Sequence, residues 1–129
     1  MNIIELFEKH KENGNWQEAL KVVQLIIEKA PHISTSWFNK GVCLDELGNH
    51  NEAAEAFIKA QELDIEDWGI HFRILRSAFL AQNADLFFGF ADYSISLNIE
   101  ILKAIEDDEL FHPILQTNNF KALKEKFNS

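Results

Sequence analysis

The amino-acid sequence predicts an all-α protein in which antiparallel helix pairs stack into a short superhelical array, or solenoid. Three observations support this fold class. Segments of the chain recur every 34 residues, apolar side chains within each segment follow helical spacing, and only five glycines and two prolines are available for tight turns. A fixed period of this length is typical of repeat architectures, whereas β-sandwiches and barrels need many more turn residues.

Two independent anchor points define the period. The segment Gly14–Ala19 reads Gly-Asn-Trp-Gln-Glu-Ala, and Gly48–Ala53 reads Gly-Asn-His-Asn-Glu-Ala. In the same register, Leu-Asp-Ile at residues 63–65 returns as Leu-Asn-Ile at residues 97–99, while a third step of the first anchor keeps only Asn83. We expect one domain, residues 1–129, made of repeats at about 1–33, 34–67 and 68–98, the last degenerate, and an incomplete repeat with a capping helix at 99–129.

The second repeat has the clearest helix-turn-helix pattern. Gly48 is predicted to end its first helix, because glycine tolerates the left-handed conformation of a helix end, and Ser34 or Ser36 can cap the start of that helix. Each of its helices carries an apolar face at three- and four-residue spacing, formed by Trp37, Gly41, Leu44 and Leu47 and then by Ala53, Ala56, Phe57, Ala60 and Leu63.

The first repeat follows the same plan. Its first helix has an apolar face at Ile3, Leu6, Phe7 and His10. Gly14 follows, then a second helix from Trp16 to Lys29. Pro31 is expected to end that helix, because the residue before a proline is disfavoured in the α region.

These residues resemble the tetratricopeptide-repeat family, whose pattern is W-x2-L-G-x2-Y, then A-x3-F, then P. The second repeat reads Trp37-x2-Lys40-Gly41-x2-Leu44, then Ala53-x3-Phe57, with Ile65 in place of the proline. The first keeps Ala19-x3-Val23 and Pro31 but has Phe7 where the pattern has glycine. The small residues Gly41 and Ala53 would let two helix backbones approach closely.

The third repeat departs from the pattern, since Leu75 and Phe87 replace the small pair. We therefore expect its helices, roughly Asp67–Ala81 and Ala84–Leu97, to lie further apart or to cross at another angle.

The C-terminal segment is expected to close the array. A short helix with Ile101, Leu102 and Ile105 should end at the acidic run Glu106–Glu109, and a loop containing Pro113 should follow. Asn118 or Asn119 can cap a final helix. This segment resembles the one that closes some bacterial tetratricopeptide arrays, so Phe120, Leu123 and Phe127 would cover the stacking face of the last repeat.

The composition of the chain disfavours several classes of function. The net charge of -9 disfavours binding to nucleic acid and to anionic membranes, which both depend on basic residues. Neither a signal peptide nor a membrane-spanning run is apparent, so a cytoplasmic location is expected. Cys43 has no disulfide partner and is expected to be a buried apolar residue.

No catalytic, cofactor or metal motif is recognisable either. The five histidines lack the i, i+4 spacing of paired metal ligands, so His10, His32, His50, His71 and His112 are interpreted as helix-surface or turn residues. The run Glu106–Glu109 lacks the turn-forming glycine of a calcium loop. We expect no enzymatic activity, no cofactor and no metal.

The family resemblance also implies where a partner would bind. In tetratricopeptide arrays the first helices of successive repeats line a concave groove that holds a segment of another protein. Transferring that arrangement gives ten predicted groove residues: Ile4, Glu8, Phe38, Asn39, Val42, Asp45, Phe72, Arg73, Arg76 and Phe79. Helical spacing independently places Phe38, Val42 and Asp45 on one face of their helix, distinct from its apolar face. In the next repeat, Phe72, Arg76 and Phe79 share a face of their helix in the same way. For Phe72 and Phe79, the alternative is burial beneath the C-terminal cap.

One subgroup of this family binds the acidic C-termini of chaperones through a clamp of Lys, Asn and Arg. Asn39 and Arg73 occupy two of the clamp positions, but Ile4, Glu8 and Gly69 stand where the clamp needs Lys, Asn and Lys, which argues against that ligand. The sequence thus predicts a non-catalytic adaptor that binds a protein or peptide. The alternative is a self-associating structural protein, such as a homodimer, or an obligate subunit of a larger complex.

Overall fold

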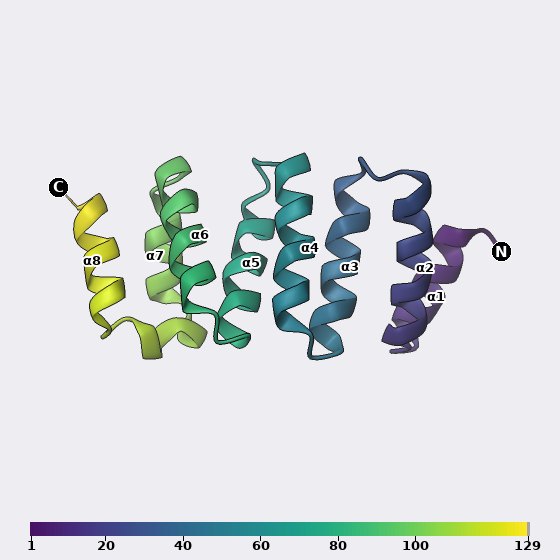
Figure 1. The fold of residues 1–129 in the computed structure, drawn as a ribbon, viewed down its shortest axis with the longest axis horizontal. Coiled ribbons are helices and arrows are strands. Elements are labelled where there is room, and N and C mark those ends of the chain that lie inside the picture. Colours follow the sequence, from purple (N-terminus) through teal and green to yellow (C-terminus); the bar gives the residue numbers. More distant parts are fainter. Residues whose placement is uncertain (129) are drawn as a thin grey trace. The chain divides into compact units, whose positions relative to one another are not determined.

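The computed structural model describes residues 1–128, which form helices and no strand (Figure 1). The predicted all-α fold class is confirmed. The chain divides into two compact units, an N-terminal unit (Met1–Ser77) and a C-terminal unit (Ala78–Ser129), so the single domain stays a prediction. The helices of the described range are α1 (Ile3–Glu12), α2 (Trp16–Lys29), α3 (Ser34–Glu46), α4 (His50–Leu63), α5 (Trp68–Leu80), α6 (Ala84–Leu97), α7 (Glu100–Asp107), η1 (Glu109–Ile114, a 3-10 helix) and α8 (Asn118–Phe127).

The turn inside each helix pair has the same backbone geometry in all three repeats. In each turn one residue with positive φ is followed by an Asn whose N–H donates to the carbonyl five residues earlier, a Schellman-type helix end. The left-handed residue is Gly14 or Gly48 in the first two turns and Gln82 in the third, with φ of 57°. A side chain costs about 1–2 kcal/mol in this conformation. The third repeat thus keeps the turn although it lacks the glycine.

The connections between pairs also repeat. Trp37 Nε1 donates to the carbonyl oxygen of Pro31 at 2.8 Å. One period later His71 Nε2 lies 2.9 Å from the carbonyl oxygen of Ile65. Because a carbonyl only accepts hydrogen bonds, His71 must carry its hydrogen on Nε2. The expectation that His71 lies on a surface or in a turn is wrong: its side chain is fully buried, whereas Trp37, one period earlier, is half-buried against the core.

Helices α3 and α4 pack closely against each other in the N-terminal unit. A Cβ atom added to Gly41 would lie 2.6–2.7 Å from three ring carbons of Phe57, a fully buried residue. The absence of a side chain at Gly41 therefore makes room for the Phe57 ring. A hydrophobic core cluster joins α1, α2 and α3. Its buried members are Phe7 of α1, Ala19, Val22, Val23 and Ile27 of α2, and Cys43 of α3.

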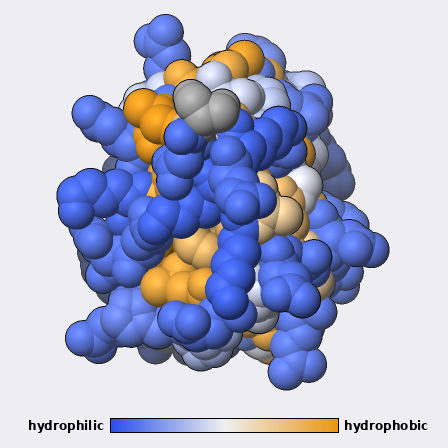
Figure 2. All heavy atoms as spheres, turned by 90° about the vertical axis from the view of Figure 1, so that its left-hand side faces the viewer, coloured by the Kyte–Doolittle hydropathy of each residue, from blue (hydrophilic) through white to orange (hydrophobic). Residues whose placement is uncertain are grey.

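An aromatic cluster fills the C-terminal unit. The fully buried ring of Phe111 in η1 lies 5.5 Å from the ring of Phe79 and 5.4 Å from that of Phe87, measured between ring centroids. In α8, Phe120 and Leu123 are buried and Phe127 is half-buried. Figure 2, viewed from the α8 side, shows hydrophilic residues over most of that face and hydrophobic ones in separate patches.

Ion pairs hold α8 to its neighbours. Lys126 Nζ lies 2.8 Å from Asp92 of α6, and Lys124 Nζ lies 2.7 Å from Glu106 of α7. The acidic run is thus only partly a solvated helix end, because Glu106 is paired with α8 and Asp108 accepts from the N–H of Leu110 to cap η1.

Some predicted helix ends need correction. Thr117, rather than Asn118 or Asn119, caps α8 by accepting from the N–H of Phe120. Neither Ser34 nor Ser36 caps α3, whose N-cap position is Ile33. The hydroxyl of Ser34 instead donates to the carbonyl of Ala60 at 2.9 Å, so this serine joins α3 to α4. The segment around Pro113 is a 3-10 helix, where we expected a loop.

Gly41→Ala should reduce the free energy of unfolding by about 1–3 kcal/mol, because overpacking against Phe57 outweighs the gain in helix propensity. Gly89→Ala in α6 is the matched control, since nothing lies within 4 Å of its added Cβ, and should raise stability by up to about 1 kcal/mol. Urea denaturation followed by circular dichroism measures both. Equal effects of the two substitutions would contradict the close approach of α3 and α4.

The stability should fall as the pH drops below about 6.5, the ordinary pKa of histidine. Burial lowers the pKa of His71 in the folded chain, against smaller opposing effects of the Ile65 carbonyl and Asp67. The unfolded chain therefore takes up this proton first as the pH falls, which favours unfolding. Urea denaturation at pH 7.5 and 5.5 should show a smaller loss for His71→Gln than for the unaltered chain. The same loss in both would rule His71 out as a source of acid sensitivity.

Candidate functional site

The most distinctive polar side chain of the N-terminal unit is Arg73 on α5. Its guanidinium carbon lies 5.6 Å from the ring centroid of Phe38 on α3 and 5.7 Å from that of Phe57 on α4. The two rings themselves are 5.3 Å apart. Both distances from Arg73 are within the range of cation–π attraction, which contributes about 0.5–2 kcal/mol. Three helices therefore fix the position of this guanidinium.

Arg73 has no acidic partner in residues 1–128. No carboxylate oxygen in that range lies within 4.0 Å of its side-chain nitrogens, although the chain has 21 acidic residues and only two arginines, Arg73 and Arg76. The side chain is half-buried rather than fully enclosed. Rings contact the flat faces of a guanidinium, whereas its N–H donors point outward in the plane. The site can therefore bind a carboxylate bidentately.

Arg76 is in a different environment because of Asp45. The Asp45 side chain on α3 is 5% exposed and accepts from the Ser77 hydroxyl through both carboxylate oxygens, at 3.0 and 2.8 Å. His50 Nδ1 at the start of α4 lies 2.8 Å from one of these oxygens, and an Arg76 nitrogen lies 3.7 Å from the other. Asp45 thus links α3 to α4 and α5, and Arg76 remains 45% exposed.

The other predicted groove residues have varied surroundings. On α1, Ile4 is 63% exposed and Glu8 is exposed as well, and no hydrogen bond or ion pair within residues 1–128 joins either to α3 or α5. Phe38, Asn39, Val42 and Phe72 are half-buried. Phe79 belongs to the C-terminal unit, where it contacts Phe87 and Phe111. The structure thus brings Phe38 together with Arg73, and Asp45 together with Arg76.

Comparison with protein-family models finds a match to the tetratricopeptide repeat over residues 34–67. This range covers α3 and α4, in which Gly41, Phe57 and Phe38 make the close packing described above. Residues 34–67 are a tetratricopeptide repeat. Comparison with curated proteins finds no significant match.

The fold extends the likeness to almost the whole chain. The Yersinia enterocolitica type III secretion translocator chaperone SycD is 18% identical, with a TM-score of 0.64 over 96% of this chain and 82% of that one. SycD in complex with a peptide of the translocator YopD has a TM-score of 0.67 at 16% identity, covering 96% and 91%. PcrH in complex with the chaperone binding region of PopD has 0.65 at 16%, covering 96% and 90%. At these identities the likeness shows the tetratricopeptide-like fold alone.

We also searched the described residues for a reactive thiol, a metal site and a membrane-spanning helix. Burial raises the pKa of the Cys43 thiol to about 11, so this thiol of the tetratricopeptide repeat is protonated and poorly nucleophilic at neutral pH. No group of three or more His, Cys, Asp or Glu side chains in residues 1–128 could hold a metal ion. None of the described helices is both long and apolar enough to cross a bilayer.

Sequence reasoning missed three residues of the site. Phe57 was assigned to the core alone, yet its ring also lies under Arg73. His50 and Ser77 hold the Asp45 carboxylate. Ser77 had a detectable signal, because this polar residue stands one period after the buried Cys43 of the tetratricopeptide repeat. No sequence signal indicated that Phe57 would lie next to Arg73, since this contact depends on how three helices pack.

Asp45→Ala should reduce the free energy of unfolding by about 1.5–3 kcal/mol, because it removes hydrogen bonds to a buried carboxylate. Asp107→Ala is the control. Its carboxylate pairs with Lys103 at 3.1 Å on an exposed surface, and its loss should cost at most about 1 kcal/mol. Thermal and urea denaturation measure both variants. Similar small effects would mean that Asp45 does not link the three helices.

Proposed function

We propose that this protein is a non-catalytic scaffold that binds a segment of another protein along α3 and α5, with Arg73 as its carboxylate-binding side chain. The observation that carries the proposal is the Arg73 guanidinium, held against two adjacent aromatic rings and without an acidic partner in residues 1–128. Two structures of the same fold are complexes, one with a peptide of YopD and one with the chaperone binding region of PopD. Both observations favour a polypeptide ligand.

The surroundings of Arg73 indicate the character of that segment. Phe38 and Val42 on α3 are half-buried apolar residues, and Asn39 between them can hydrogen-bond to a peptide group. A ligand with one acidic residue next to apolar residues would complement this surface. Because the chain has a net charge of -9, a strongly acidic partner would be repelled at long range. Recognition by Arg73 is therefore a short-range contact, and the ligand as a whole need not be acidic.

Peptides selected from a displayed random library against the whole protein should share an acidic residue flanked by apolar residues. Arg73→Ala together with Arg76→Ala should weaken their binding tenfold or more, since arginine contacts are enriched among binding hot spots. The melting temperature should fall only modestly, because the lost cation–π contacts contribute about 0.5–2 kcal/mol. Arg73→Ala alone should account for most of the loss, because Asp45 already lies beside Arg76.

The control is Lys59→Ala with Lys103→Ala. It changes the net charge equally and removes two exposed lysines that pair with Glu62 and Asp107 within their own helices. This pair should bind like the unaltered protein in isothermal titration calorimetry. Normal binding by the double arginine variant would show that α3 and α5 are the wrong surface, and an equal loss in the lysine pair would show that only net charge matters.

A further inference from the structure

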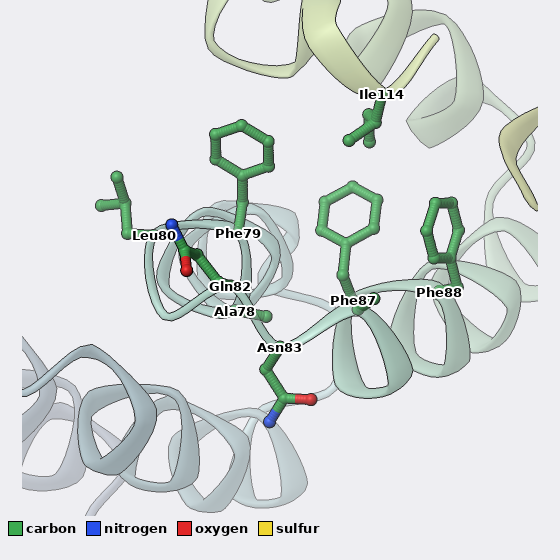
Figure 3. A pocket seen from close by; sticks show the side chains of 9 residues that line it. Ala78, Phe79, Leu80, Gln82, Asn83, Phe87, Phe88 and Ile114 are labelled. Carbon is green, nitrogen blue, oxygen red and sulfur yellow. The ribbon is translucent and has the colours of Figure 1, made fainter. Parts of the chain in front are cut away.

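A second feature lies in the C-terminal unit, apart from the arginine site. A cavity of about 340 Å³, open to solvent, is lined by the end of α5, the start of α6 and the last residue of η1. Figure 3 shows the rings of Phe79, Phe87 and Phe88 standing on the same side of the α5–α6 turn, with Ile114 reaching toward Phe87 from the opposite side. The cavity is therefore shaped chiefly by aromatic side chains.

The chemistry of the lining selects an uncharged aromatic group. No ionisable side chain lines the cavity, although about a quarter of the residues in the chain are charged. Its volume is roughly twice the 150 Å³ or so that holds benzene in an engineered protein cavity, which leaves room for an indole ring. Phenylalanine rings favour edge-to-face and offset contacts with another ring, and Phe79 and Phe88 are only half-buried.

Gln82 gives the edge of the cavity a hydrogen-bonding group. It lines the cavity and adopts a left-handed conformation, with φ of 57°, at the position where the first two repeats have Gly14 and Gly48. Its exposed carboxamide has no hydrogen-bond partner within residues 1–128. A side chain that the backbone disfavours thus stands at the turn that borders this cavity. A carboxamide both donates and accepts, as a peptide group does.

We propose that this cavity binds an aromatic side chain presented by a partner polypeptide, and that the Gln82 carboxamide hydrogen-bonds to a peptide group beside that side chain. The open mouth allows the chain of the partner to lead away from the inserted ring. The paired donor and acceptor of Gln82 match a peptide group, which a free aromatic compound lacks. All residues of this site belong to the C-terminal unit, whereas Arg73 belongs to the N-terminal unit.

The probe that tests the site is N-acetyl-L-tryptophanamide, an indole ring with two peptide-like groups, titrated into the whole protein. It should shift the amide NMR signals of Phe87 and Phe88 and the methyl signals of Ile114, with a dissociation constant on the order of 1 mM or below. N-acetylglycinamide, which has no ring, should cause no shift. The proposal is wrong if the tryptophan probe leaves these signals unchanged.

One variant and a matched control locate the binding. Ala84→Trp places a large side chain at an exposed position of the lining and should weaken binding at least tenfold. Ser96→Trp, exposed near the other end of α6, should have no effect. Equal binding by all three proteins would show that the probe does not enter the cavity.

Gln82→Gly tests the hydrogen bond, and relief of the left-handed conformation should raise the melting temperature, so folding is not at risk. Binding of N-acetyl-L-tryptophanamide should weaken at least threefold, whereas binding of 3-methylindole, which lacks peptide groups, should be unchanged. If 3-methylindole binds the unaltered protein as tightly as the amide does, the site takes a free aromatic compound and the polypeptide proposal is overturned.

Discussion

The packing of the Phe57 ring against Gly41 is the constraint on which the N-terminal unit depends. A ring in that place needs a residue without a side chain on α3, since any Cβ atom there would overlap ring carbons. The same ring lies against Phe38 and under Arg73. One close helix–helix contact thus sets both the spacing of the tetratricopeptide repeat and the position of the guanidinium that we propose to bind a partner.

Successive repeats of the chain share the same backbone geometry, although the side chains that support it differ from one repeat to the next. Trp37 and His71 each bond to a carbonyl in the preceding connection, with an indole in one repeat and an imidazole in the next. Cys43 and Ser77 occupy equivalent buried places, and the Ser77 hydroxyl donates to Asp45. These exchanges explain why the 34-residue period weakens after Ile65 although the turn at Gln82 keeps its geometry. They also explain why solved structures match nearly the whole chain, whereas the family model matches one repeat.

Much of the fold could be predicted from local patterns. The span Ala84–Leu97 was predicted residue for residue, and α5 differs from the expected Asp67–Ala81 by one residue at each end, because apolar periodicity and turn residues act within a few positions. Helix caps were less predictable, since Ser34 bonds to a neighbouring helix instead of to its own. The burial of His71 could have followed from its alignment with Trp37. The candidate site was predictable only in part, because the contacts of Arg73 and Asp45 join three helices, and the cavity near Phe79 depends on where η1 lies.

Nuclear Overhauser spectroscopy of the protein without any partner tests most directly whether packing alone fixes Arg73. We predict cross-peaks from the δ-methylene and ε protons of Arg73 to the ring protons of both Phe38 and Phe57, together with upfield ring-current shifts of that methylene group. An Arg73 side chain with random-coil shifts and no cross-peak to either ring would contradict it, and the carboxylate-binding role of Arg73 would lose its structural basis.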